Sequence, residues 1–334
     1  MENNAIFGLL FIVIGGIFSG TFSTPFKFNK KWQWENNWLV WSFIALLFAP
    51  WIVAFFTIPH LTEVYGSESS NLMLVILFGL IWGVGAILFG KGIDYLGISL
   101  SIPIMLGLIN TVGTLMPIIV KDPNYLLTSS GIKIMIGIAV IIVGIVLFSV
   151  AGSKKNKKSD SDKKNVQKSL FVKGLVICIL AGVFGPMINF AFVFGEPIQA
   201  KAIVLGASPI FATNAIWSIV LSAGFTINLL YCIFLLKRTG SWKNYKNSSV
   251  SYWLFAILAG VIWYLSVMFY GMGCNFMGNL GASVGWATMQ TVAIIAGNVA
   301  GLMTGEWKGA NQSAMKFMYA GLFFLVIGVF IIAM

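Results

Sequence analysis

Ten long runs without a charged side chain dominate this sequence. A helix needs about 20 apolar residues to cross the hydrocarbon core of a bilayer, and most of the runs reach that length. Only 9% of the 334 residues are charged, whereas a soluble domain carries about 25% charged residues. We therefore predict an all-α integral membrane protein embedded in the lipid bilayer. Its ten transmembrane helices are expected at 5–26, 38–58, 71–90, 95–119, 134–151, 174–195, 210–236, 250–273, 279–303 and 317–334.

The basic residues fall on alternate connections between these helices. The odd-numbered connections and their flanks hold 18 of the 21 Lys and Arg residues, and the even-numbered connections keep only Lys121, Lys133 and Lys201. Cytoplasmic loops of membrane proteins carry an excess of Lys and Arg. We therefore place the odd connections in the cytoplasm and predict both termini outside. This arrangement explains the formal charge of +11 without nucleic acid as a partner.

A basic, low-complexity segment at 153–169 lies in the middle of the chain, with five predicted helices on either side. We expect it to be a cytoplasmic linker between two five-helix repeats, residues 1–152 and 170–334. Because five is an odd number, the second repeat enters the membrane from the opposite side. The expected architecture is a 5+5 inverted-topology repeat, which is typical of secondary transporters.

Two pairs of segments support this duplication. IGGIFSGTFSTPFKF (14–28) aligns without gaps with LAGVFGPMINFAFVF (180–194), and FGLIWGVGAILFGKG (78–92) aligns with AGVIWYLSVMFYGMG (259–273). Chance similarity between Gly- and Phe-rich helices explains either match alone. Two matches in the same order favour duplication. In the first pair, Gly185-Pro186 aligns with Ser19-Gly20. We expect helices one and six to be irregular at these positions.

No catalytic or energy-converting motif accompanies the helices. The single histidine, His60, sits at a predicted helix end, so neither a Ser-His-Asp triad nor a His-based metal site can form within the membrane. No GxxxxGK[ST] loop is present, which excludes an ATP-driven pump. We therefore expect a transporter driven by an existing gradient, with no enzymatic activity, no cofactor and no metal.

Uncharged polar and aromatic side chains occur together within the predicted helices. Amide groups can bind sugar hydroxyls, and an aromatic face suits the C–H face of a sugar. Interhelical hydrogen bonds and interfacial Trp anchors are the alternative explanation. The expected substrate-binding residues are Trp82, Asn110, Asn189, Trp263, Trp286 and Gln290.

The predicted helices contain no Asp, Glu, Lys or Arg. A charged substrate would lack a counter-charge near the midplane, which favours a neutral solute. The candidates for ion coupling lie at helix ends: Glu196 and Asp94, with Glu35 and Glu306 as weaker ones. Sodium, held by neutral oxygens, is the alternative to a proton.

Several segments resemble one known family. PFKFNKKWQWENNW (25–38) and YLGISLSIPIMLGLINTVGTLMPII (95–119) are similar to signatures of the L-rhamnose–proton symporters, a family of the drug/metabolite transporter superfamily. EPIQAKAIVLGASPIF (196–211), INLLYCIFLL (227–236) and GEWKGA (305–310) resemble its second half. The likeness covers essentially the whole chain and is most specific in the KKWQWE stretch.

The resemblance implies a ten-helix importer of L-rhamnose, or of a related neutral sugar, with a proton, in the cytoplasmic membrane of a bacterium. One rival is a metabolite or drug exporter of the same superfamily, although a cationic drug would call for a buried carboxylate. A second rival is a non-transporting membrane sensor or scaffold, which would not need so many buried amides.

Overall fold

The computed structural model describes residues 5–96, 98–156, 168–246, 248–305 and 307–333. Within this part of the chain, ten helices are long and apolar enough to cross a membrane, and each overlaps one of the predicted windows. This confirms the all-α, ten-helix prediction. The spans are Ala5–Phe28, Trp34–Thr57, Ser70–Ile93, Ile104–Lys121, Ser129–Gly152, Phe171–Val204, Asn214–Thr239, Val250–Met277, Gly281–Met303 and Gln312–Ile332.

The predicted linker 153–169 lies mostly outside the described residues, which lack 157–167. Before it, the elements are α1 (Ala5–Thr21), the 3₁₀ turn η1 (Thr24–Phe28), α2 (Trp34–Ser42), the π-helical η2 (Phe43–Phe48), α3 (Ala49–Thr57), α4 (Leu61–Ser67), α5 (Ser69–Leu96), α6 (Ile98–Lys121), the 3₁₀ turn η3 (Pro123–Leu127) and α7 (Ser129–Asn156). After it come α8 (Lys168–Phe184), α9 (Met187–Phe194), α10 (Glu196–Val204), α11 (Asn214–Thr239), α12 (Lys243–Lys246), α13 (Val250–Met277), the 3₁₀ turn η4 (Gly278–Leu280), α14 (Gly281–Met303) and α15 (Gln312–Ala333).

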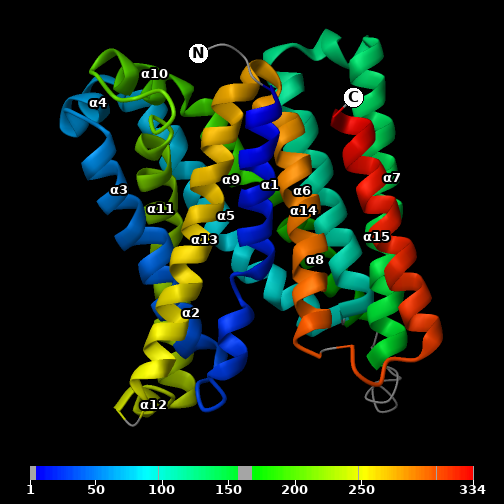
Figure 1. Cartoon of the computed structure of the whole chain (residues 1–334). Coiled ribbons are helices and arrows are strands. Elements are labelled where there is room, and N and C mark those ends of the chain that lie inside the picture. The colour runs from blue at the N-terminus through cyan, green and yellow to red at the C-terminus, as the bar shows by residue number, and fades with distance from the viewer. Residues whose placement is uncertain (1–4, 97, 157–167, 247, 306, 334) are drawn as a thin grey trace.

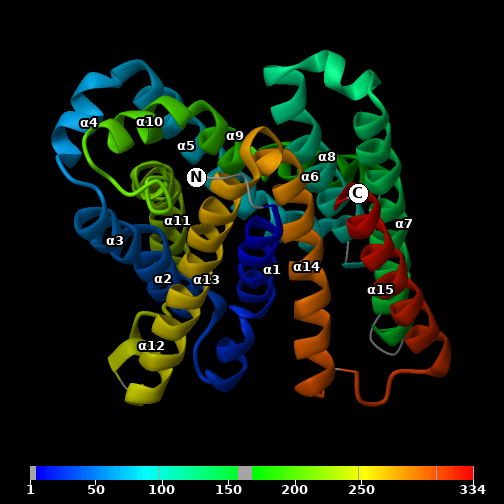
Figure 2. The ribbon, with the colours of Figure 1, turned by 45° about the horizontal axis from the view of Figure 1, so that its top comes forward.

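Helices of the two halves pack against each other throughout the bundle. α1 contacts α13 and α14, and in the same way α8 contacts α5 and α6. The two last helices of the halves, α7 and α15, form the most extensive pair, and they lie side by side in Figures 1 and 2. The cavity that forms at the centre therefore takes its walls from both halves of the chain.

Glycines bring α1 close to its neighbour. A Cβ atom at Gly20 would overlap the main chain of α14 at Ala293, and one at Gly16 would overlap Val292. Small residues at such a seam allow helix backbones to approach within van der Waals distance. The seam fixes the position of α1 beside α14, which lines the central cavity.

The sixth span is broken, as the sequence predicted. α8 ends at Phe184, Gly185 and Pro186 form a turn, and α9 begins at Met187. Proline has no N–H to donate to the preceding turn of a helix. The sequence also predicts an irregularity at Ser19-Gly20 in the first span. This prediction is wrong, because α1 stays helical as far as Thr21.

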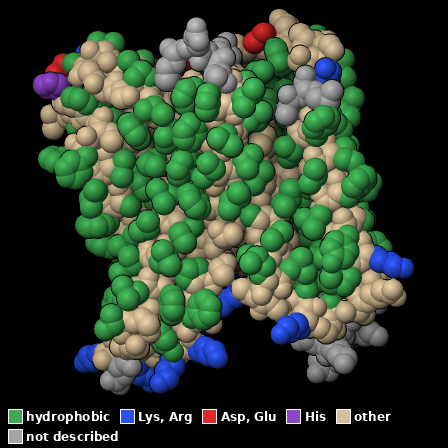
Figure 3. All heavy atoms as spheres, in the orientation of Figure 1, with side chains coloured by type: hydrophobic (Ala, Val, Ile, Leu, Met, Phe, Trp, Pro, Cys, Tyr) green, Lys and Arg blue, Asp and Glu red, His purple; other side chains and the backbone are tan. Residues whose placement is uncertain are grey.

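The two ends of the bundle differ. α1 begins and α15 ends at the same end of the bundle, where α4 and α10 lie across it (Figures 1 and 2). We call this the terminal end. Lys and Arg side chains gather at the opposite, lysine-rich end, where a notch separates two lobes (Figure 3).

Candidate functional site

A cavity of about 300 Å³ lies at the centre of the bundle. Residues of α1, α2, α5, α6, α8, α9, α11, α13 and α14 line it, so both halves contribute. Four of the six expected substrate-binding residues are on its wall: Trp82, Trp263, Trp286 and Gln290. No Asp, Glu, Lys or Arg is among the lining residues.

Stacked aromatic rings form one wall of this central cavity. The rings of Trp82 and Trp263 stack with their centroids 5.8 Å apart and an interplanar angle of 22°. Gly224 leaves the space that the Trp82 ring occupies. Trp38, also on the wall, donates a hydrogen bond from Nε1 to Asn228 Oδ1 at 2.8 Å. The wall therefore offers a fixed aromatic surface from three different helices.

Trp286 is held in place by α6. Its Nε1 donates to the carbonyl oxygen of Ile109 at 3.2 Å. The indole passes over Gly113, where any Cβ would overlap it. One turn further along α14, Gln290 faces the same cavity, as their spacing of four residues predicts. Among the described contacts, the Gln290 amide has no protein partner, so it is free to bind a ligand.

Asn189 lies one layer behind the wall. It is fully buried, and its Nδ2 donates to the carbonyl oxygens of Gly113 and Ala282, each at 2.9 Å. Its Oδ1 accepts from the hydroxyl of Tyr270 at 2.5 Å. Asn189 thus ties α9 to α6 and α14 and positions Tyr270, which does line the cavity.

Sequence reasoning missed Tyr270, although a signal was present. Trp263, Ser266, Val267 and Tyr270 all line the cavity. They are spaced i, i+3, i+4 and i+7, which places them on one face of α13. Of this face, the expected substrate-binding residues include only Trp263.

Asn110 has a different environment from the other expected residues. It is 1% exposed, it is not among the lining residues, and neither polar atom of its amide has a hydrogen-bond partner. The hydroxyl of Thr114, one turn further along α6, is buried and unpartnered as well. Buried polar groups without partners are costly, so this face of α6 holds unused hydrogen-bonding capacity next to Ile109 on the wall.

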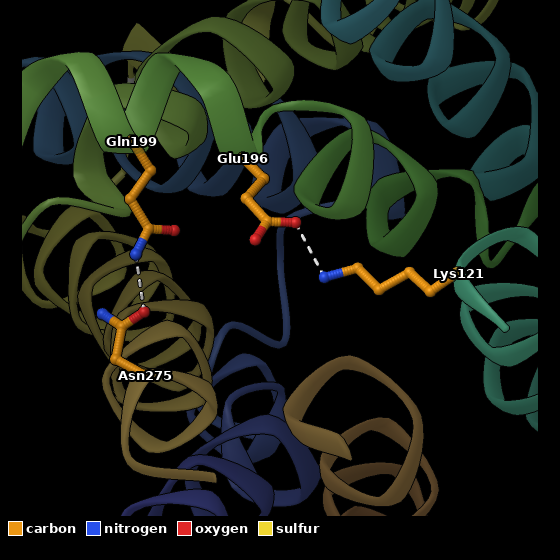
Figure 4. A network of polar contacts seen from close by, with 4 residues as sticks. All are labelled: Lys121, Glu196, Gln199 and Asn275. Atoms are coloured by element: carbon orange, nitrogen blue, oxygen red, sulfur yellow. Dashed lines mark hydrogen bonds and ion pairs between the residues drawn. The ribbon is translucent and has the colours of Figure 1, made fainter. Parts of the chain in front are cut away.

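A second, smaller cavity of about 170 Å³ lies toward the terminal end. We call it the outer cavity; polar side chains of α6, α10 and α13 surround it (Figure 4). Lys121 Nζ lies 2.7 Å from Glu196 Oε2, and Gln199 Nε2 donates to Asn275 Oδ1 at 2.7 Å. Glu196, one expected ion-coupling residue, is therefore ion-paired here with its side chain 62% exposed.

The other carboxylates considered for coupling lie elsewhere, and Glu306 is outside the described residues. Asp94 belongs to α5, and its side chain is outside the described part of the structure. Glu35, in the first turn of α2, is 5% exposed. The hydroxyls of Thr239 and Ser241 each lie 2.7 Å from its Oε1. Within the described chain, no cluster of three His, Cys, Asp or Glu side chains could hold a metal ion.

The KKWQWE stretch packs against the α11–α13 connection at the lysine-rich end. The ring of Trp32 meets Tyr245, Tyr252 and Trp253 edge-on at 5.2–5.9 Å. Burial raises the pKa of Tyr245 to about 12, so its hydroxyl remains protonated and donates to the carbonyl oxygen of Asn36 at 3.1 Å. This cluster fixes the start of α2 and with it Trp38.

A larger hollow of about 760 Å³ lies beside α3 and is almost wholly apolar. Phe55 and Phe56, which line it, are 75% and 79% exposed. In a membrane protein, such a surface faces lipid chains. The central cavity, where aromatic faces and a free amide converge, is therefore the candidate substrate site.

Comparison with known proteins places this architecture in a family. The sequence model described as "L-rhamnose-proton symport protein (RhaT)" matches residues 1–334. Proteins named L-rhamnose-proton symporter from Yersinia pestis (strain Pestoides F) and Yersinia pseudotuberculosis serotype O:1b (strain IP 31758) are each 29% identical over 348 residues, which cover 100% of this chain and 99% of the relative. The chain therefore belongs to the L-rhamnose-proton symport protein family, as the KKWQWE stretch predicted.

Proposed function

We propose that this protein imports L-rhamnose, or a closely related neutral sugar, by proton symport across a bacterial cytoplasmic membrane. The observation that carries the proposal is the central cavity, with aromatic walls, one free amide and no charged residue on its wall. Its volume of about 300 Å³ is at the lower end of the range for small-molecule sites. The family and the names of the relatives support the same substrate.

The wall of the cavity suits a deoxy sugar. L-rhamnose has a methyl group where a hexose has a hydroxymethyl group, so it presents hydroxyls on part of its surface and carbon on the rest. Gln290 is placed to bind hydroxyls, and the faces of Trp82 and Trp263 to cover C–H groups. Asn189 acts through Tyr270, and the unpartnered amide of Asn110 becomes available when α6 moves.

Transport follows from rocking of the two halves around this cavity. The exchange of partners between halves, with α1 on α13 and α14 and α8 on α5 and α6, supports an inverted repeat of residues 1–152 and 170–334. In such repeats the substrate site lies at the interface. The excess of Lys and Arg supports a cytoplasmic lysine-rich end and external termini. α10 lies across the terminal end and a notch hollows the lysine-rich end (Figures 2 and 3), which supports a conformation that faces the cytoplasm.

Proton coupling is assigned to Glu196 and Asp94. Glu196 joins α10 to α6 through Lys121, so a proton on its carboxylate would remove the charge that holds Lys121. Glu196→Gln is expected to make uptake insensitive to a pH gradient. Unchanged pH dependence would move the assignment to Asp94, or to sodium as the coupling ion.

The test is uptake of labelled L-rhamnose into proteoliposomes under an imposed pH gradient and, separately, a sodium gradient. Concentrative uptake with the pH gradient alone is expected. Asn189→Leu and Gln290→Leu should abolish it without loss of membrane insertion. Absence of uptake under both gradients, with correctly inserted protein, would overturn the proposed function and leave only the fold.

A further inference from the structure

The outer cavity is lined by charged and amide side chains, although it lies apart from the central cavity. Lys121, Glu196, Gln199 and Asn275 converge on it from α6, α10 and α13 (Figure 4). Its 170 Å³ corresponds to about six water molecules at their volume in the liquid. The space is therefore large enough for one monosaccharide ring in place of water.

We propose that the outer cavity is a second binding site for the neutral sugar, occupied before the sugar reaches the central cavity; this rests on the proposed function. The four polar side chains are already paired with one another, at 2.7 Å in each pair. A sugar hydroxyl both donates and accepts, so it can insert between Gln199 and Asn275, or between Lys121 and Glu196, without leaving a partner unpaired. The ring of Phe192, also on the wall, offers a face for C–H groups.

The charges of this site select for a neutral ligand. Lys121 and Glu196 cancel each other within the cavity. An anion would meet the Glu196 carboxylate and a cation would meet the Lys121 ammonium, whereas a neutral polyol uses both as hydrogen-bond partners. The site thus has the same preference for an uncharged solute as the central cavity, reached by a different set of side chains.

A thin aromatic layer separates the two cavities. Phe192, on the wall of the outer cavity, stacks on Trp217 with centroids 5.3 Å apart and contacts Tyr270 at 5.5 Å. Trp217 and Tyr270 belong to the wall of the central cavity. Two stacked side chains, Phe192 and either Trp217 or Tyr270, therefore separate a sugar in the outer cavity from its next site.

The experiment places a thiol on the wall of the outer cavity and asks whether sugar protects it. Val193 lines the cavity without taking part in the polar pairs, so Val193→Cys leaves the proposed site intact. The natural Cys178, Cys232 and Cys274 are buried, but Cys274 also lines the outer cavity, so Cys274→Ala is the background for Val193→Cys and serves as the blank. A membrane-impermeant thiosulfonate is added to intact cells with and without L-rhamnose. At a sugar concentration of about twice Kd, modification is expected to slow about threefold.

Three additional variants show whether protection comes from sugar bound in the outer cavity. With Gln290→Leu in the central cavity, protection of Val193→Cys should persist; with Asn275→Ala or, independently, Gln199→Ala, it should disappear. Protection that disappears with Gln290→Leu would report a movement caused by central binding and would overturn the outer site. Uptake of L-rhamnose by the Val193→Cys protein without any protection would also overturn it. Loss of uptake by the unsubstituted protein in the same cells would instead count against the proposed function.

Discussion

The central and outer cavities are separated by one aromatic layer, yet the first has an uncharged lining and the second a charged one. The central cavity is walled by Trp82, Trp263 and Trp286 and has no charged lining residue. The outer cavity has an ion pair and two paired amides on a smaller volume. The difference follows from access to water, because Lys121 and Glu196 keep 34% and 62% of their side chains exposed.

This contrast teaches where a membrane protein can use charge. Removing a charged group from water costs several kcal/mol unless its partners replace that water. At the terminal end the cost is low, so an ion pair can close the bundle. At the centre an uncharged wall avoids the cost, and aromatic faces supply the binding surface.

The largest effect is expected from closing the central cavity itself. A Cβ at Gly113 would overlap the indole nitrogen of Trp286. Gly113→Ala should therefore displace Trp286, reduce L-rhamnose uptake more than about 100-fold and lower stability by about 1–3 kcal/mol, which is typical of overpacking. Gly107→Ala, on the same helix, has nothing within 4 Å of the new Cβ and is the control. Equal losses in both variants would show that uptake does not depend on the position of Trp286.

A matched pair of charge insertions compares the cavities directly. Gln290→Glu places a carboxylate in the uncharged central cavity, and Gln199→Glu places one beside the Lys121–Glu196 pair. Desolvation should make the first variant lose uptake about 100-fold at neutral pH and recover relative to the unsubstituted protein as pH falls, since burial favours the neutral acid. The second should lose less than about tenfold. Initial uptake rates across a pH series measure both, and similar losses would remove the contrast between the cavities.

A moderate effect is expected from the layer behind the wall. Tyr270→Phe deletes the hydroxyl that bonds to Asn189 and leaves Asn189 Oδ1 buried without a partner, which costs about 1–3 kcal/mol. Uptake should fall about tenfold. Tyr264→Phe, also on α13, deletes a hydroxyl bonded to Asn214 instead and should leave the KM for the sugar unchanged. A KM change of the same size in both variants would deny Tyr270 a role in the site.

The smallest effect concerns the ion pair of the outer cavity. Exposed ion pairs contribute about 0–1 kcal/mol, so Lys121→Met, Glu196→Gln and the double variant should change the melting temperature only slightly. A double-mutant cycle on the purified protein gives the coupling energy. A coupling energy above about 2 kcal/mol would mean that this pair, rather than helix packing, keeps the terminal end closed.

The sequence was sufficient for the helices and for four residues of the wall. Charge-free runs predict membrane spans because the bilayer tolerates few alternatives to a helix. Trp286 and Gln290 could be placed together because residues four apart share a helix face. Trp82 and Trp263, 181 positions apart, were expected in the site as aromatic residues among polar ones within the predicted helices.

The remaining features depend on contacts between distant segments. A buried amide looks the same in the sequence whether it lines a cavity, as Gln290 does, or bonds to main-chain oxygens behind it, as Asn189 does. The pairing of Glu196 with Lys121, 75 residues away, arises because α10 turns across the end of the bundle after Gly195. Gly195 and Pro197 mark the break in the sequence, but they do not encode the direction in which α10 leaves.

The aromatic layer of Phe192, Trp217 and Tyr270 also determines where an electric field acts. Water in the cavities on its two sides would carry the potential of each compartment up to the layer, so most of the membrane potential would fall across these stacked rings. Moving one elementary charge through 100 mV requires about 2.3 kcal/mol. Moving a neutral sugar across this layer requires no electrical work, whereas for a proton nearly all of the electrical work is required at this layer. The voltage dependence of uptake is therefore expected to report the opening of this single layer.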